Sequence, residues 1–212
     1  MESKKPVMEI AIRKVKAGQE NEFIAARSVF IGKLKEQSGV EKDWEFKSFF
    51  TMPEPDDTDV FVGMTRYEST DAMQAIANKL MQSPEAGAFF RTFDMKAFVA
   101  LQSADSGNFK LEDHIKASNV LEVAVRSVQP GKEGEFDEKR NAFFDVIAQQ
   151  AGYLFDQEFI DLQTGDRVVL IGWQSMEDFQ KGVRALQTKP QMSDFFEILN
   201  VRAYQALTLS AD

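Results

Sequence analysis

Apolar and polar side chains alternate over residues 7–15, which predicts a strand with two different faces. Met8, Ile10 and Ile12 fall on one face of this strand. After Gly18 the apolar positions take the three- and four-residue spacing of a helix, which continues as far as Leu34. The chain is therefore expected to open with a strand, a glycine turn and a helix.

The same unit occurs a second time, 113 residues later. VMEIAIRKVKAGQENEFIAAR at residues 7–27 is matched by VLEVAVRSVQPGKEGEFDEKR at residues 120–140. The match resumes at an offset of 106 from Val62 and Val168 onwards, and the difference, 113 − 106 = 7, places a seven-residue excess in the first copy around TMPEPDD. We interpret the chain as a tandem duplication.

Each copy has the periodicities of a strand, a helix, two strands, a helix, a short helix and a final strand. In the first copy these are expected at residues 7–15, 20–37, 44–51, 60–67, 69–80, from 84 and 95–102. In the second copy they are expected at residues 120–128, 133–150, 155–162, 167–173, 176–186, 192–199 and 201–209. This order predicts an α+β protein with two ferredoxin-like domains, residues 1–102 and 119–212, joined by a polar linker, residues 103–118, that contains a helical turn.

In each copy the face of the first strand that points away from Ala11 or Ala124 is apolar. It carries Ile10 and Ile12 in one copy and Val123 and Val125 in the other. Two exposed apolar sheet faces in one chain would most simply cover each other. We therefore expect the two domains to pack sheet to sheet as an internal pseudo-dimer, a dimeric α/β barrel, with further homo-oligomerisation left open.

The composition narrows the functional classes. A net charge of −9 argues against a nucleic-acid partner, and the absence of cysteine excludes disulfides and thiolate metal sites. The 19 phenylalanines require a large core or an apolar cavity. No apolar run approaches the about 20 residues of a membrane span, and MESKKPVMEI does not read as a signal peptide, so we expect a cytoplasmic protein without a membrane partner.

The succession of strand, glycine turn, Glu-Phe helix and strand, with the run IGWQS at residues 171–175 before a helix, resembles the antibiotic biosynthesis monooxygenase family of the dimeric α/β-barrel superfamily. The resemblance covers nearly all of both halves. It implies a ligand cavity between sheet and helices in each half, and cofactor-free oxidation of aromatic phenols with O₂. The same superfamily holds haem degraders, which use an Asn on the first strand, a Trp at the end of the third strand and a helix His.

Carried over to this sequence, the haem degraders' pattern matches only in part. Trp173 stands at the Trp position and Tyr67 at its first-half counterpart, but Ala11 and Ala124 replace the Asn. The single histidine, His114, lies in the linker. Haem bound through histidine is therefore not expected, and the resemblance implies neither a cofactor nor a metal.

Arg27 and Arg140 are the leading catalytic candidates, because each lies between two phenylalanines on the inward stripe of its helix. In one interpretation each forms a structural pair with a glutamate of the first strand, while Arg13 reaches solvent at the strand end. In the other, each faces a cavity and stabilises an oxyanion of a ligand, with small Ala11 and Ala124 making room.

The other candidates are core residues in one interpretation and line the ligand site in the other. Tyr67 and Trp173 would stack on a flat ligand. The remaining substrate-binding candidates are Glu9, Glu122, Arg13 and Arg126 on the first strands and Phe89, Phe90, Phe195 and Phe196 on the short helices. The acidic residues of the second strands are expected to be solvated edge charges and not metal ligands; they are Asp43, Glu45, Asp156 and Glu158.

These features favour a cofactor-independent monooxygenase acting on a small aromatic or enolisable compound. Arg27 or Arg140 would hold the substrate oxyanion, and Trp173 or Tyr67 would pack on its ring. A non-catalytic small-molecule-binding or stress-related protein with the same cavity is the alternative, and a structural protein with filled halves is a third possibility. The two halves are expected to differ in function, and Trp173 favours the second half.

Overall fold

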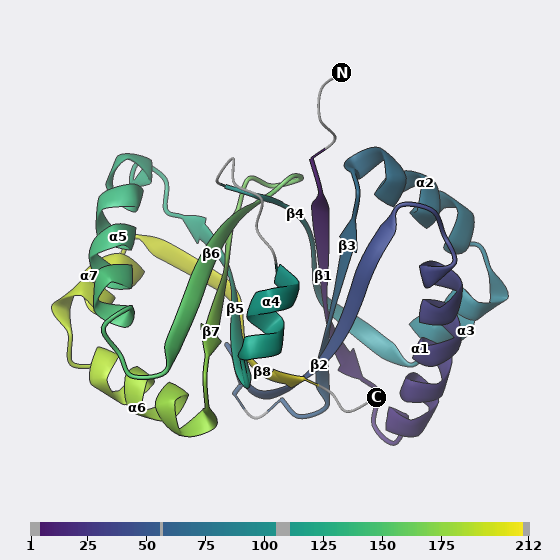
Figure 1. Cartoon of the computed structure of the whole chain (residues 1–212), viewed down its shortest axis with the longest axis horizontal. Coiled ribbons are helices and arrows are strands. Elements are labelled where there is room, and N and C mark those ends of the chain that lie inside the picture. Colours follow the sequence, from purple (N-terminus) through teal and green to yellow (C-terminus); the bar gives the residue numbers. More distant parts are fainter. Residues whose placement is uncertain (1–4, 56, 105–110, 210–212) are drawn as a thin grey trace. The chain divides into compact units, whose positions relative to one another are not determined.

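The computed structural model describes residues 5–55, 57–104 and 111–209, and Figure 1 shows the arrangement of the elements. The chain divides into two compact units. Unit 1 comprises residues 1–49, 56–102 and 209–212, and unit 2 comprises residues 50–55 and 103–208. Among the described residues, no helix combines the length and apolar character needed to cross a bilayer.

Unit 1 is built on an antiparallel sheet with the strand order β2-β3-β1-β4. Helices α1, α2 and α3 lie on one face of this sheet (Figure 1). The elements are β1 (Val7–Val15), α1 (Glu20–Lys35), β2 (Val40–Met52), β3 (Val60–Tyr67), α2 (Thr70–Leu80), α3 (Pro84–Phe90) and β4 (Phe93–Ser103).

Unit 2 has the corresponding strand order β6-β7-β5-β8, with α5, α6 and α7 on one face and α4 on the other (Figure 1). The His114 ring of α4 lies 4.5 Å from the Phe155 ring of β6. The elements are α4 (Leu111–Ala117), β5 (Val120–Val128), η1 (Glu133–Glu135), α5 (Phe136–Ile147), β6 (Tyr153–Asp161), β7 (Arg167–Trp173), α6 (Met176–Leu186), α7 (Pro190–Phe196) and β8 (Leu199–Leu209).

The elements follow the order predicted from the sequence, and β1, β3, β5, β7 and α6 have the expected bounds. The expected helix over residues 133–150 begins as the 3₁₀ turn η1 and ends at Ile147. The expected helix over residues 192–199 was wrong at its end, because α7 stops at Phe196 and Leu199 already pairs with Val128 as the first residue of β8.

Local signals explain where several helices start and stop. Ser69 and Ser175 accept hydrogen bonds from the backbone N–H three residues later, as N-caps of α2 and α6. After α5, Gly152 has φ +75°, and a Cβ there would lie 2.4 Å from the Asp178 side chain. Only glycine adopts this conformation and permits this approach without strain, so the turn into β6 is fixed locally.

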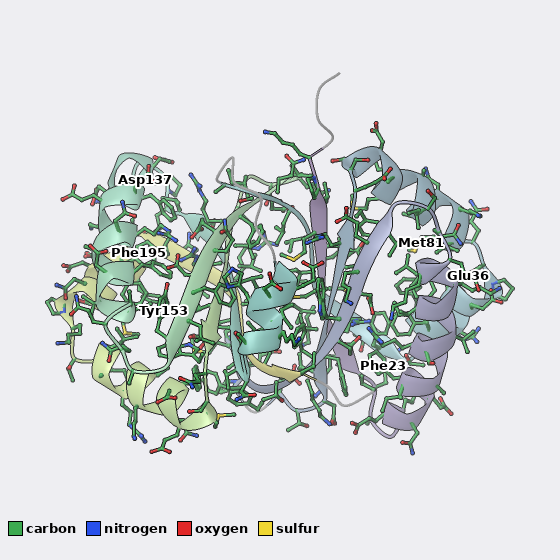
Figure 2. The ribbon with its side chains drawn as sticks, viewed as in Figure 1. Phe23, Glu36, Met81, Asp137, Tyr153 and Phe195 are labelled. Carbon is green, nitrogen blue, oxygen red and sulfur yellow. The ribbon has the colours of Figure 1, made fainter. Side chains whose placement is uncertain are left out.

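The two faces of each sheet divide as the alternation predicts. Arg13 lies on the helix side of β1, 5.4 Å from the Phe23 ring of α1, which confirms that this face looks towards the helix. On the opposite face Ile10 and Val123, at equivalent places in the two units, are fully buried. Phe195 lies beside α5 in Figure 2, where it packs on Phe143 in the core of unit 2.

Candidate functional site

A buried cluster of charges lies between the sheet of unit 1 and α1. The Arg13 Nη2 donates hydrogen bonds to both carboxylate oxygens of Glu45, at 2.7 and 2.8 Å. Its guanidinium also lies 5.3 Å from the Phe89 ring, within cation–π range. Gly63 makes this placement possible, because a Cβ at that position would lie 2.3 Å from Arg13 Nη2.

Arg27 joins the same cluster from α1. Its Nη2 donates to Asp43 at 2.6 Å, and its Nε forms an ion pair with Glu45. Thr65 Oγ1 donates to the second Asp43 oxygen at 3.0 Å. Burial raises the pKa of Glu45, while the positive charges of Arg13 and Arg27 oppose that shift. One carboxylate therefore serves two arginines.

Unit 2 repeats this cluster. Arg126 Nη2 donates to both oxygens of Glu158, at 2.6 and 2.8 Å, and Arg140 Nε donates to the same carboxylate at 3.2 Å. Arg140 also forms an ion pair with Asp156 and lies 4.3 Å above the Phe144 ring. Arg140 is thus held by two carboxylates and a ring, as a structural residue would be.

These contacts correct two expectations. Glu45 and Glu158 are not solvated edge charges but are 6% and 7% exposed, and Arg13 does not reach solvent, being 4% exposed. The partners of Arg27 and Arg140 lie on the second strand, not the first. The sequence did signal that these carboxylates matter, because Asp-x-Glu recurs at residues 43–45 and 156–158. The pairing of each glutamate with an arginine 32 residues earlier is set by the tertiary fold.

Unit 1 contains a cavity of about 390 Å³ between the sheet and its helices. This volume lies within the range typical of small-molecule sites. The polar lining residues are Glu9, Arg13, Asp43, Thr65 and Tyr67; the others include Ala11, Phe30, Ile31, Leu34, Gly63, Ile76, Leu80, Met81, Phe89, Phe90, Phe93, Met95 and Phe98. Arg27 is not part of the lining. Figure 2 shows Met81, whose side chain is exposed, on the helix side of the unit 1 sheet.

Glu9 is the titratable group that stands out in this cavity. Desolvation raises its pKa from 4.5 to about 7, against the opposing effects of the Arg13 charge and the Tyr67 hydrogen bond. Tyr67 Oη lies 3.4 Å from Glu9 Oε2. The burial of Tyr67 and, to a smaller extent, the negative charge of Glu9 raise the pKa of the Tyr67 phenol. The phenol therefore keeps its proton and can donate a hydrogen bond. A carboxyl that titrates near neutrality beside a phenol is suited to general acid–base chemistry.

The corresponding region of unit 2 carries larger side chains. The β3 residues opposite Ala11 and Glu9 are Gly63 and Thr65. Opposite Ala124 and Glu122 in unit 2 stand two larger residues, Val169 and Ile171. At the end of the strand, Trp173 replaces Tyr67 and is fully buried. The cavity of about 390 Å³ lies in the first half, whereas Trp173 favours the second half from the sequence.

Gly182 of α6 admits the Trp173 indole, since a Cβ at position 182 would lie 2.5 Å from Trp173 Cη2. We expect Gly182→Ala to lower the free energy of unfolding by about 1–3 kcal/mol through overpacking. Gly87→Ala in α3 is the matched control, because a Cβ there meets nothing within 4 Å, and it should be neutral or stabilising by up to about 1 kcal/mol. Urea unfolding of the two variants checks this, and equal effects would contradict it.

Two other kinds of site, a surface groove and a metal site, are less well supported by the structure. An open groove of about 710 Å³ over α1 and α3 is lined by Lys16, Gln19, Glu22, Ala25, Ala26, Val29, Ala88, Arg91 and Thr92. Its charged lining residues, Lys16, Glu22 and Arg91, are all exposed, so the groove offers no desolvated group. Within residues 5–55, 57–104 and 111–209, no group of three or more His, Asp or Glu side chains is arranged to hold a metal ion.

Solved structures share this architecture at low sequence identity. An anthrone oxidase-like protein has a TM-score of 0.69 at 9% identity, with 98% of this chain and 92% of the other covered. A Fusobacterium nucleatum protein provisionally named a monooxygenase has a TM-score of 0.60 at 11% identity, covering 97% and 93%. Chlorite dismutase from Candidatus Nitrospira defluvii has a TM-score of 0.62 at 13% identity, covering 100% and 93%.

These likenesses show the fold. It is an α+β fold shared with monooxygenase-like, anthrone oxidase-like and chlorite dismutase proteins. No protein-family model matches the sequence. No curated protein matches it either.

Proposed function

We propose that the protein is a cofactor-independent oxygenase acting on a small aromatic or enolisable compound bound in the unit 1 cavity. The observation that carries the proposal is Glu9, a carboxyl with a pKa of about 7 that faces an apolar cavity of about 390 Å³. Arg27 and Arg140, the candidates predicted from the sequence, are both paired with carboxylates, so the oxyanion role passes to Tyr67 and Arg13 and Glu9 acts as the base.

In this mechanism Glu9 removes a proton from an activated methylene or hydroxyl group of the substrate. The resulting anion is delocalised over the ring and reduces O₂ directly, so that a C–O bond forms. For an activated methylene, one oxygen atom becomes a carbonyl, and the second leaves as water with the two hydrogens. For a phenol, the hydroxyl hydrogen and one ring hydrogen leave in the same way as water, and the ring becomes a quinone. Once Glu9 has taken the proton, the Tyr67 hydroxyl turns from Glu9 and donates a hydrogen bond to the developing oxyanion. Arg13, which lines the cavity, stabilises this oxyanion electrostatically.

The known neighbours agree with this class of reaction, since one is named anthrone oxidase-like and another provisionally a monooxygenase. The tandem duplication, the face-to-face packing of the two sheets and a cytoplasmic location belong to the same proposal. The duplication is supported by the constant-offset repeat, and the packing of the sheets by the apolar face of β1 and β5 that carries Ile10 and Val123. A small hydrophobic molecule is the proposed partner.

The test is O₂ consumption by the full-length protein with anthrone, naphthols and acetylacetone as substrates. We expect Ile31→Phe, which narrows the cavity, to lower the rate tenfold or more. Phe144→Ile makes the reverse change at the equivalent position of unit 2 and should leave the rate unchanged. Circular dichroism of the two variants shows whether each remains folded.

The outcomes separate the candidate functions. Binding of these compounds without O₂ consumption would overturn the oxygenase and support the non-catalytic binding protein. A rate lost in Phe144→Ile but kept in Ile31→Phe would move the active site out of the unit 1 cavity. The absence of both ligand binding and O₂ consumption would favour a structural protein.

A further inference from the structure

The two units differ in how they satisfy the equivalent carboxylates of their first strands, Glu9 and Glu122. Glu122 on β5 accepts hydrogen bonds from Trp173 Nε1 of β7, at 2.5 Å, and from Tyr204 Oη of β8. A desolvated carboxylate without donors is costly, so these two side chains complete the unit 2 interior. Burial raises the pKa of Glu122, and the hydrogen bonds from Tyr204 and Trp173 oppose that shift.

In unit 1 the same arrangement lacks one donor. Tyr67 takes the place of Trp173, and its hydroxyl lies 3.4 Å from Glu9. The place of Tyr204 is taken by Phe98, because Phe98 pairs with Ala11 in the sheet as Tyr204 pairs with Ala124. Among the residues that the structure describes, Glu9 therefore has Tyr67 as its hydrogen-bond donor and no hydroxyl at position 98.

The missing donor position coincides with the cavity. Phe98 and Glu9 both line it, and Phe98 is 48% exposed at its rim. A ligand entering past Phe98 therefore meets aromatic and aliphatic walls with one hydrogen-bond acceptor on the sheet side. Such a site should bind an apolar ring that has a hydrogen-bond donor at one edge more tightly than the same ring without the donor.

We propose that the ligand of the unit 1 cavity is a ring compound that donates an O–H or N–H to Glu9, in the place that the Tyr204 hydroxyl takes at Glu122, and that Phe98 determines this specificity. The inference rests on the proposed function only in placing the ligand in this cavity. It concerns binding alone and holds whether or not the bound ligand is oxidised.

The test compares donor probes with their methylated partners, 2-naphthol with 2-methoxynaphthalene and indole with N-methylindole. Binding to the full-length protein is measured by calorimetry at pH 8.5, where Glu9 is ionised. Each donor should bind about tenfold to a hundredfold more tightly than its methylated partner, since the latter leaves the carboxylate without its second donor. Phe98→Tyr should abolish that preference, because its own hydroxyl occupies the donor position.

Two control variants isolate the hydroxyl. Phe98→Leu alters the ring without adding a donor and should keep the preference, and Tyr204→Phe changes only unit 2 and should also keep it. Equal affinities within each pair, no binding of either donor, or a preference that survives Phe98→Tyr would overturn the inference. O₂ consumption without a donor preference would sink this inference alone, whereas a donor preference without O₂ consumption would sink the oxygenase alone.

Discussion

Replacing Arg126 with methionine should lower the free energy of unfolding by about 3–5 kcal/mol, the largest stability loss expected in this protein. Arg126 is 2% exposed and provides both short hydrogen bonds to Glu158, which is itself buried. Methionine keeps the apolar bulk against the Phe195 ring, 5.4 Å from the guanidinium. It leaves a desolvated carboxylate with the longer 3.2 Å bond from Arg140. Unfolding in guanidinium chloride measures this loss of stability, and the m-value should stay unchanged.

Two further variants show that the loss comes from the buried charge. Arg140→Met should cost less, about 1–2 kcal/mol, because Glu158 keeps Arg126 and Asp156 keeps the Tyr153 hydroxyl, at 2.6 Å. The double change Arg126→Met with Glu158→Leu removes both charges and should recover most of the stability. A cost below about 1 kcal/mol for Arg126→Met alone would contradict this account.

Replacing Glu9 with glutamine should reduce O₂ consumption by roughly 10²–10⁴-fold, the contribution of a positioned general base. The wild-type rate should rise with pH through about 7, as the Glu9 carboxylate forms, and then level off. The variant should lose this inflection, whereas Glu122→Gln, the equivalent change in unit 2, should leave rate and inflection unchanged. A wild-type inflection that survives in Glu9→Gln would assign the base to another group.

The stability of the Glu9 variant should change in the opposite direction to its activity. Between pH 4.5 and about 7 the folded protein retains a proton that the unfolded chain has lost, so ionisation of Glu9 lowers stability as pH rises through this window. Above pH 7 Glu9→Gln should therefore be more stable than the wild type, by up to about 3 kcal/mol, and below pH 4.5 the difference should approach zero. A destabilised variant at pH 8 would show that the Glu9 charge is structural.

The sequence alone was sufficient for the secondary structure and its order. Alternation over residues 7–15 and helical spacing before Gly39 are local signals, because each depends on which side of one element faces the core. The caps at Ser69 and Ser175 and the glycine turns are equally local. These features were read correctly to within a few residues, and they placed Glu9 and Arg13 on the helix side of β1.

The tertiary structure decided the charge pairing and the site. Glu45 and Glu158 looked like edge charges, but both carboxylates lie beneath helices, α1 and α5, and each pairs with two arginines. Which carboxylate reaches which arginine depends on the register between strands and on helix position, neither of which a one-dimensional pattern contains.

The cavity depended on the same three-dimensional information. The sequence showed Tyr67 and Trp173 at equivalent positions, but it did not show that Trp173 would be admitted by Gly182 and would bind Glu122. The empty volume inside a unit depends on the side chains that several elements contribute to it. The effect of small residues such as Gly63 and Thr65 therefore appears only when those elements pack together. The sequence thus determined two similar frameworks, and packing between sheet and helices left the Glu9 carboxyl facing the unit 1 cavity.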